Sequence, residues 1–376
     1  MSQHAKPKVA VLMGGRSGEH EVSLQSGRAI LEALDPQRYE TIPIGIDKNG
    51  EWHLLGIEDP LENPTDPKRI RIHTSGVKVI SVPVPGRPWI RIESGEHAPW
   101  PRPDVVFPVL HGTFGEDGTI QGLLELMEIP YVGAGVLGSS VGMDKDLMKR
   151  LFKDAGLAVG DFTCVREPEW KADRDGVIAR IAKRFELPVY VKPANLGSSV
   201  GISRVSAKSD LAAAIQDAFR YDRKILVEQG IHGREIEVSV LGNDEPQASV
   251  PGEIVPRDGF YSYAAKYLDQ DGARLLVPAE LPEDTIAALQ RCAVDAFRAV
   301  SCEGMARVDF FLEQGTGRVL INEINTIPGF TRISMYPKLW EASGVPFSEL
   351  VDRLVSLALE RHDSKKRLLR EYSPGP

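Results

Sequence analysis

The sequence predicts a mixed α/β fold (α+β) with more than one domain, and three observations support this prediction. An apolar run at residues 9–13 leads directly into Gly14-Gly15 and then into helical spacing of apolar residues, which is the pattern of a βα unit. Strand-like and helix-like segments continue to alternate as far as residue 360. The chain has 376 residues with 42% hydrophobic content, enough apolar material for the cores of two to three domains.

The composition argues against several functional classes. The formal net charge of −8 disfavours a polyanion such as DNA as the main partner, although a local cluster of Lys and Gly could still bind a nucleotide. The three cysteines form no C-x-x-C pair, which disfavours structural zinc or a disulfide framework and fits a reducing compartment. There is no signal-peptide pattern at the N-terminus and no run of about 20 apolar residues. We therefore expect a cytoplasmic protein with neither a nucleic-acid nor a membrane partner.

Periodicity and turn residues predict the individual elements. We expect strands at 9–13, 105–110, 188–192, 225–229, 236–241, 306–312 and 318–322, and helices at 143–157, 211–219, 282–300 and 347–360. In the helix at 143–157, a shared face is predicted for Leu147, Leu151, Phe152 and Ala155. Breaks near residues 140 and 230–235 predict the domain boundaries. The polar stretch at 252–273 is long for a loop and typical of a lid, with a surface excursion as the alternative.

A loop of small residues at 192–201 follows a predicted strand that ends in Lys192. Backbone N–H groups in such loops can cradle a phosphate, with hydroxyl groups as further donors. The spacing is not that of a Walker A loop, which reads G-x-x-x-x-G-K-[ST] and opens a helix. Taken alone, a loop of this kind is more often a plain hairpin.

Two consecutive strands near the C-terminus carry polar residues that could bind a metal ion. Arg307 and Asp309 are two residues apart on the first strand, and Glu323 and Asn325 are two apart on the second, so each pair shares a face. The turn at 314–317 favours an antiparallel pair that brings all four side chains together. Carboxylates and substrate phosphates are the ligands that Mg²⁺ prefers. The alternative is a solvated sheet face with surface salt bridges.

Three other polar positions each have a functional and a structural interpretation. Gly329 follows a proline, and its N–H could stabilise an anion near the metal strands, or the segment could be a plain turn. Glu19 could bind an ammonium group, although on local grounds it more simply favours the positive N-terminus of a helix. A lone His111 after a strand is more often a hydrogen-bonded structural residue than a catalyst.

In their order along the chain, these motifs closely resemble the D-alanine–D-alanine ligases of the ATP-grasp superfamily. The resemblance extends from Gly14 to about Val345. The matching words are GGRSGEHEVSLQSG at 14–27, HGTFGEDGTIQG at 111–122, GMDKDLMK at 142–149, VKPANLGSSVGIS at 191–203, EIEVSVLG at 235–242, AAKYL at 264–268, RVDFF at 307–311 and INEINTIPGFT at 321–331. Long words in a fixed order are far more specific than any single glycine motif.

The resemblance implies three domains whose last two grasp ATP between their sheets. Residues 1–140 would form an N-terminal open α/β (pre-ATP-grasp) domain that binds the first substrate. Residues 141–232 would form the central ATP-grasp domain, and residues 233–376 the C-terminal one, with the metal site and a lid loop at 252–273. The resemblance also suggests a homodimer.

The resemblance assigns roles to residues of this chain. ATP would be bound by Lys145, Lys192, Ser199, Glu228, Gln229, Gly230, Ile231, Glu235 and Lys266. Magnesium, as two ions that Mn²⁺ could replace, would be held by Asp309, Glu323 and Asn325. Glu19 would bind the ammonium group of the first substrate, and His111 would be an orienting residue near it. Arg307 and the Gly329 N–H would hold the reacting carboxylate. Ser334, with Lys266, would bind the carboxylate of the second substrate. The catalytic set would be Glu19, Ser198, Tyr267, Arg307 and Gly329, with the first three also tying the lid shut.

The activity implied is the ATP-dependent ligation of two D-alanine molecules through a D-alanyl phosphate, with release of ADP and phosphate, for peptidoglycan precursor synthesis. The pair Lys266-Tyr267 disfavours the family branch that makes a D-alanine–D-lactate ester. That branch and other ATP-grasp carboxylate–amine ligases remain the alternatives. A non-catalytic nucleotide-binding module would be expected to lose Arg307 or a metal ligand. A nicotinamide oxidoreductase is disfavoured because no G-x-G-x-x-G fingerprint is present.

Overall fold

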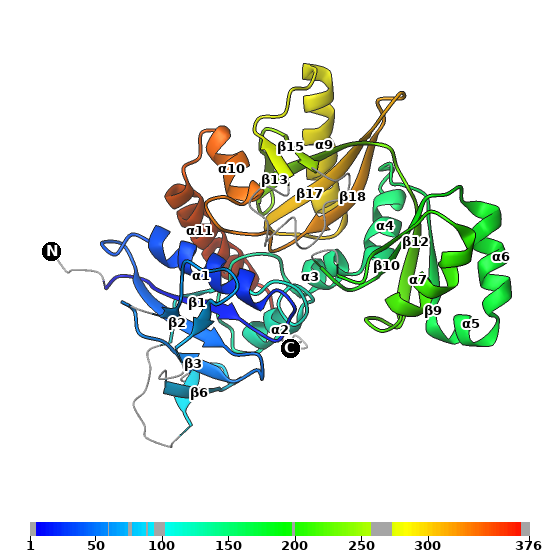
Figure 1. The fold of residues 1–376 in the computed structure, drawn as a ribbon. Helices are drawn as coiled ribbons and strands as arrows, with labels where there is room; N and C mark the ends of the chain where they lie inside the picture. The colour runs from blue at the N-terminus through cyan, green and yellow to red at the C-terminus, as the bar shows by residue number, and fades with distance from the viewer. Residues whose placement is uncertain are drawn as a thin grey trace, which may run out of the picture.

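The computed structural model describes residues 5–58, 60–73, 77–87, 89–93, 102–197, 200–256 and 273–369. Three larger β-sheets and a two-stranded sheet form in these ranges, and helices cover the larger sheets (Figure 1). Within the same ranges no helix is long and apolar enough to cross a membrane.

The first sheet is an open α/β sheet formed by the N-terminal part of the chain. Its strands lie in the order β7 (Ile90–Ile92), β6 (Val77–Ser81), β3 (Trp52–Leu54), β2 (Glu40–Ile46), β1 (Lys8–Gly14) and β8 (Val105–Pro108). Strand β1 is parallel to both β2 and β8, as a βα unit predicts, and the outer strands are antiparallel. Helices α1 (His20–Ala33) and α2 (Thr119–Leu126) follow β1 and β8 along the chain, and β4 (Leu61–Glu62) pairs with β5 (Arg71–Ile72).

The second sheet is antiparallel and carries its helices on one side (Figure 1). Its order is β11 (Ser203–Val205), β10 (Val189–Pro193), β12 (Lys224–Gln229) and β9 (Phe162–Arg166). Its helices are α5 (Glu167–Ala172), α6 (Arg174–Arg184) and α7 (Leu211–Ala218), with a 3₁₀ turn at Lys208–Asp210. Apolar residues of these helices and strands share one core, so this sheet buries its apolar surface largely by itself.

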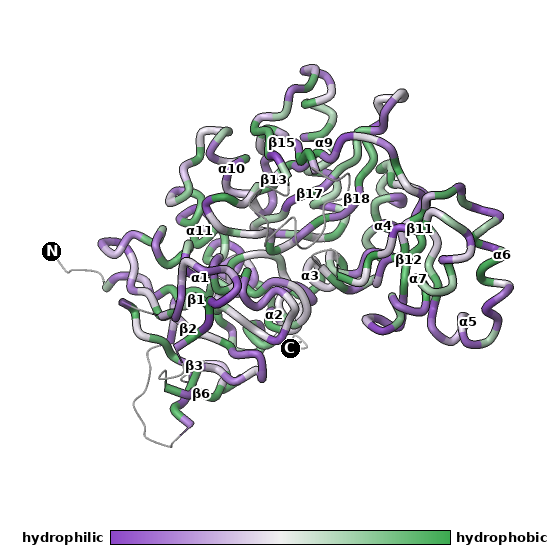
Figure 2. Tube along the Cα trace, viewed as in Figure 1, coloured by the Kyte–Doolittle hydropathy of each residue, from purple (hydrophilic) through white to green (hydrophobic). Residues whose placement is uncertain are grey.

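The third sheet contains the two strands that were predicted to bind metal. Its order is β16 (Ala273–Leu276), β15 (Gly252–Pro256), β13 (Gly233–Gly242), β17 (Gly304–Glu313) and β18 (Val319–Asn325), with β14 (Gln247–Ala248) paired to β13. Helix α9 (Glu283–Ala299) packs on one face through Leu289, Ala293 and Phe297, as its predicted spacing requires. Apolar and polar residues alternate along the strands of this sheet (Figure 2).

The predicted loop at 252–273 is wrong at both ends. Residues at its start form β15 and residues at its end begin β16, and these two strands pair with each other. The prediction failed because polar residues such as Glu253 are compatible with a strand whose polar face is buried against Arg234. The middle of the predicted lid lies outside the described residues.

The predicted helix at 143–157 forms, shorter at both ends, as the second of two consecutive helices, but its predicted face is wrong. Helices α3 (Val136–Met143) and α4 (Lys145–Asp154) meet at Asp144, whose carboxylate caps α4 by accepting from the N–H groups of residues 146 and 147 at 3.1 Å. Leu147 is 47% exposed, whereas Lys145 and Lys149 are buried with Met148 and Phe152. The helix therefore turns a partly cationic face inward, which apolar periodicity alone does not reveal.

Two C-terminal helices join the first and third sheets. Helix α10 (Met335–Ala342) is followed by α11 (Phe347–Lys366), which extends beyond the predicted end at residue 360. Helix α11 contacts α1 and β8 as well as β13 and β17, and lies between the two sheets (Figure 1). Each of the three larger sheets falls within one predicted domain range, although the boundaries themselves stay a prediction because this shared packing crosses one of them.

Candidate active site

A cavity of about 920 Å³ lies between the second and third sheets. Strands β10 and β12 line one side, and β13, β15, β17 and β18 line the other, while α4 contributes two lysines. Ten of the predicted site residues line this cavity together: Lys145, Lys192, Glu228, Gln229, Gly230, Ile231, Glu235, Asp309, Glu323 and Asn325. The structure thus brings the predicted ATP and metal residues to one place, while their roles stay a prediction.

Three buried lysines surround the carboxylates of this cavity. Lys192 Nζ lies 2.8 Å from one oxygen of Glu228, and Lys149 Nζ lies 3.4 Å from the other. Burial favours the neutral acid, but these two ammonium groups outweigh it and hold the pKa of Glu228 below its usual range. Lys145 Nζ lies 3.5 Å from Glu323 and donates to the carbonyl of Leu196 at 2.8 Å. This concentration of positive charge suits the phosphates of a nucleotide.

The segment 229–231 offers one backbone donor to the cavity. The Gln229 N–H donates to Asp161 O at 2.9 Å, and the Gly230 N–H donates to Pro188 O at 3.0 Å. Among the described residues, the Ile231 N–H has no hydrogen-bond acceptor. Of these three residues predicted to bind ATP, Ile231 is therefore the one whose backbone amide is available as a donor.

The metal strands pair as predicted, with one irregularity that positions the acids. Asp309 lies opposite Glu323 in the register, and Arg307 lies opposite Asn325. The register shifts between Asp309 and Phe310, so that Asn322 has no partner residue. Because side chains alternate along a strand, this β-bulge moves Glu323 to the face opposite that of Ile321, which packs in the core with Phe310. The bulge thereby places the second carboxylate on the cavity side.

The donor set at these strands fits a hard divalent cation. Asp309 and Glu323 supply carboxylates, Asn325 lies 3.0 Å from Asp309, and all three line the cavity. Such oxygen donors, completed by phosphate oxygens, match the preference of Mg²⁺. The Arg307 guanidinium makes a bidentate contact with Asp309 at 2.7 and 2.8 Å and lies 3.0 Å from Glu237. It therefore orients Asp309 and offsets the acidic charge next to the metal residues.

Glu19 lies where the first sheet meets the loop after β10. It precedes α1 and is buried, and its backbone N–H donates to Ser17 Oγ at 3.1 Å. A Cβ atom placed on Gly112 or Gly197 would lie only 2.6 or 2.7 Å from its carboxylate. Both glycines therefore allow close approach of their backbones to this carboxylate. Gly197 lines the cavity, so Glu19 adjoins it from the side of the first sheet.

His111 holds the segment that contains Gly329. Because the Ile327 carbonyl can only accept, His111 Nδ1 carries the proton and donates to it at 2.9 Å. Nε2 then accepts from the Ser26 hydroxyl at 2.9 Å, and Ser26 Oγ accepts from the Phe330 N–H at 3.2 Å. Burial is the main reason that the pKa of His111 lies below its usual range, which keeps the ring neutral. Its structural role is thus to fix the turn at 327–330, although a further role as an orienting residue stays a prediction.

Gly329 lies within this turn, and Ser334 follows it along the chain. In the described part of the chain, the Gly329 N–H has no hydrogen-bond acceptor. A Cβ atom on Gly329 would lie 3.1 Å from Ser334 Oγ, which accepts from the Thr331 N–H at 3.1 Å. The two predicted substrate residues are therefore neighbours, beside the cavity and not in its lining.

Three buried residues at this site were not predicted from the sequence. Glu237 lies opposite Asp309 on β13. It could have been predicted, because it is two residues from Glu235 on one strand and therefore shares its face. Lys149 follows Lys145 by one helical turn and could have been found by that spacing. Glu116 accepts from the N–H groups of Gly112 at 2.7 Å and Ile327 at 3.0 Å. Burial, with the negative charge of Glu19 nearby, raises its pKa to about 8, a consequence of folding that no local pattern reveals.

Four predicted site residues fall outside the described residues: Ser198, Ser199, Lys266 and Tyr267. Their predicted roles in ATP binding and in closing the lid stay predictions.

Sequence comparisons relate the whole chain to one family of enzymes. Residues 8–134 match the family described as D-ala D-ala ligase N-terminus, and residues 151–356 match D-ala D-ala ligase C-terminus. A D-alanine–D-alanine ligase of Shouchella clausii is 49% identical over 97% of this chain and 98% of its own length. A D-alanine–D-alanine ligase A of Chromobacterium violaceum is 50% identical over the same shares of the two chains.

Solved structures give the same relationship at the level of the fold. The D-alanine–D-alanine ligase from Coxiella burnetii is 39% identical, covers 97% of both chains and superposes with a TM-score of 0.82. The VanG D-Ala:D-Ser ligase from Enterococcus faecalis is 36% identical over 94% of this chain and all of its own, with a TM-score of 0.81. These relationships confirm the ATP-grasp fold that the motifs implied. The chain belongs to the D-alanine–D-alanine ligase family.

Proposed function

We propose that this enzyme uses Mg·ATP to join two molecules of D-alanine into D-alanyl-D-alanine. The observation that supports this proposal most directly is the cavity between the second and third sheets. Its lining combines a cluster of buried lysines with the oxygen donors of Asp309, Glu323 and Asn325. A site of this composition can hold a nucleotide triphosphate with its cation.

The first step is transfer of the terminal phosphoryl group to the carboxylate of one D-alanine. A carboxylate is a poor electrophile because its negative charge repels a nucleophile, and its phosphorylation supplies phosphate as a leaving group. Lys145 and Lys192 offset negative charge on the phosphates, and Lys149 helps by neutralising Glu228, the acid next to Lys192. Bound Mg²⁺ would neutralise phosphate charge at Asp309, Glu323 and Asn325.

The second step is attack of the other D-alanine's amine on the acyl phosphate, with departure of phosphate. Arg307 and the Gly329 N–H are the groups proposed to stabilise the developing oxyanion. The turn that carries Gly329 is fixed by the hydrogen bonds of His111 and Ser26, which supports a positioned rather than a mobile donor. Glu19 is proposed to bind the ammonium group of the first D-alanine.

The second substrate is the point at which the alternatives diverge. A structural relative is named as a D-Ala:D-Ser ligase, and the Lys266-Tyr267 pair is our argument against D-lactate. We would measure phosphate release from Mg·ATP with D-alanine alone, with added D-serine, with added D-lactate, and with L-alanine as the control. We expect full release with D-alanine alone and a dipeptide in the mass spectrum. Release that requires D-serine or D-lactate would assign the enzyme to another branch, and ATP binding without any release would overturn the proposal.

We also propose that the product enters peptidoglycan precursor synthesis in the cytoplasm and that the enzyme is a homodimer. The composition and the family support these proposals. Sedimentation equilibrium of the full chain would test the homodimer, and a single species with the mass of one chain would contradict it.

A further inference from the structure

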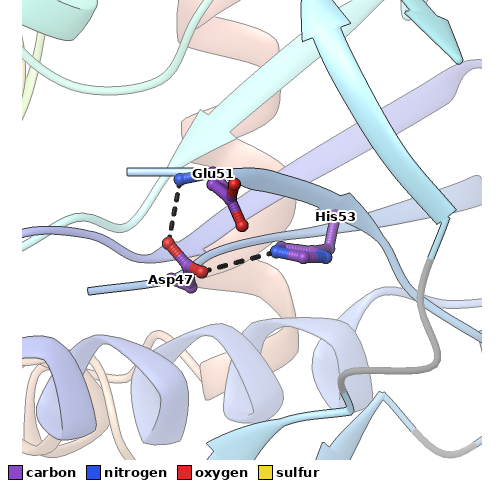
Figure 3. A group of neighbouring side chains, drawn as sticks. All are labelled: Asp47, Glu51 and His53. Carbon is purple, nitrogen blue, oxygen red and sulfur yellow. Dashed lines mark hydrogen bonds and ion pairs between the residues drawn. The ribbon is translucent and has the colours of Figure 1, made fainter. Parts of the chain in front are cut away.

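The turn between β2 and β3 brings together three side chains that could bind a metal ion (Figure 3). Asp47 follows β2, Glu51 precedes β3, and His53 lies within β3. Each can offer one ligand atom such that all three atoms lie within 4.8 Å of one another. Figure 3 shows a carboxylate oxygen of Asp47 facing the ring of His53, with Glu51 above Asp47 in the view, and His53 Nε2 lies 3.6 Å from Asp47 Oδ2.

The imidazole of His53 is buried without a hydrogen bond. The residue is 4% exposed, and neither ring nitrogen has a hydrogen-bond partner in the part of the chain that the structure describes. A buried polar group without a partner costs about 1–3 kcal/mol. Because Nε2 points toward Asp47, a cation between them would satisfy this nitrogen.

Asp47 is prepared to act as a ligand. Its Oδ1 accepts from the N–H groups of Asn49 at 2.8 Å and Glu51 at 2.9 Å, which fixes the carboxylate and directs Oδ2 toward His53. The carboxylate is therefore held in place before any ion arrives.

We propose that Asp47, Glu51 and His53 form a second cation site, for a divalent transition-metal ion such as Zn²⁺. Two ligand atoms on a tetrahedral zinc ion, each about 2.0–2.1 Å from it, lie about 3.4 Å apart. The observed 3.6 Å between Nε2 and Oδ2 is close to this separation. One imidazole with two carboxylates leaves the fourth position to water, and the imidazole disfavours Mg²⁺.

Glu51 and Lys78 determine how strongly the site binds. Glu51 is exposed and forms an ion pair with Lys78 Nζ at 2.8 Å. A bound cation would take the Glu51 carboxylate from this ammonium group, so Lys78 competes with the ion. Removal of Lys78 should therefore strengthen cation binding.

The site would reinforce contacts between this turn and the segment that contains Glu19. Lys48 in the turn forms an ion pair with Glu21 of α1 at 2.6 Å. Gly50 has φ +90°, and a Cβ atom there would lie 2.8 Å from Arg16 Cδ. A cation that fixes the turn is thus expected to raise the melting temperature of the protein, because it binds the folded chain preferentially.

The test is calorimetric titration of the untagged full chain with Zn²⁺ in excess Mg²⁺, with Co²⁺ absorption as a second readout. We expect one Zn²⁺ per chain. Loss of His53 in His53→Ala should weaken binding at least tenfold, since even disturbing an outer partner of a metal ligand costs about 10–100-fold. Glu51→Gln removes an exposed ligand without disturbing the core, so a weakening there cannot be attributed to misfolding.

Two further variants complete the test. His73→Ala removes a histidine that lies 3.5 Å from Glu62 in the two-stranded sheet, and it should bind Zn²⁺ like the parent. Lys78→Ala should bind more tightly than the parent. No Zn²⁺ binding by the parent, or equal affinity in the parent, His53→Ala and Glu51→Gln, would overturn the proposal.

Discussion

Glu228 lies between two buried ammonium groups. This arrangement predicts that removing the carboxylate lowers the free energy of unfolding far more than removing either ammonium group. Lys192 and Lys149 lie 2.8 and 3.4 Å from its two oxygens, and all three residues are buried. The perturbations are Glu228→Gln and Lys149→Met, which preserve side-chain size while each removes one charge.

The magnitudes follow from the distances. At an effective dielectric constant of about 20, unit charges at these separations attract by about 5–6 kcal/mol. Lys149→Met loses one such attraction, but it also relieves repulsion from Lys192 and the burial cost of an ammonium ion, which is several kcal/mol. We therefore expect a net loss of only about 0–2 kcal/mol. Glu228→Gln leaves two buried ammonium groups facing each other, and a broken buried pair costs about 3–5 kcal/mol.

The assay is urea unfolding of the nucleotide-free variants at neutral pH and fixed ionic strength. The double variant should be more stable than Glu228→Gln alone, because the second substitution removes one of the two unpaired ammonium groups. Lys149→Met that is as destabilising as Glu228→Gln, or a double variant that loses the sum of both effects, would refute the electrostatic reasoning.

Three other substitutions have defined outcomes. Arg307→Lys keeps the charge but loses the bidentate contact, so we expect kcat to fall about 10²–10³-fold with ATP binding largely retained. Glu116 has a pKa raised to about 8 in the folded protein, so its contribution to stability is complete below about pH 4.5 and is lost as the pH rises through 8. Glu116→Gln should therefore make the melting temperature less dependent on pH between about pH 5 and 9. Ser26→Ala leaves His111 Nε2 and the Phe330 N–H without their partner and should cost about 1–3 kcal/mol of unfolding free energy while raising KM for D-alanine.

Exposed positions provide matched controls for two of these variants. Arg318→Lys alters an exposed arginine in the turn between β17 and β18, and Ser356→Ala removes a hydroxyl on the exposed side of α11. Each should behave like the parent. Unchanged kcat in Arg307→Lys, a melting temperature in Glu116→Gln that keeps the parent's pH slope, or full stability in Ser26→Ala would each contradict its prediction.

Much of the third sheet could be predicted because its information is local. The two-residue spacing of Arg307 and Asp309, and of Glu323 and Asn325, identified a shared face, and the glycine-containing turn between the strands identified their antiparallel pairing. The β-bulge at Asn322 was not predicted, because the adjacent polar residues Asn322 and Glu323 interrupt the alternation without showing which of them lacks a partner on β17. The bulge is nevertheless what places Glu323 on the cavity face.

The error at α4 has a different origin. Apolar periodicity assigned Leu147 to the shared face, but the partner of this helix is a cavity lined by acids, so the face with Lys145 and Lys149 is buried instead. The proximity of His53 and Asp47 was also not predicted, because it too arises from tertiary structure. Their proximity depends on the conformation of the turn and on burial by neighbouring strands, which no spacing rule expresses.

The proposed mechanism has one consequence that no other route to the dipeptide shares. If the carboxylate of the first D-alanine attacks the terminal phosphorus of ATP, one of its oxygens leaves with phosphate. We would therefore supply D-alanine with ¹⁸O in both carboxylate oxygens and analyse the released phosphate by mass spectrometry. The mechanism predicts one ¹⁸O atom in each phosphate formed with the dipeptide. Phosphate without ¹⁸O, released in step with dipeptide formation, would contradict phosphorylation of the substrate carboxylate.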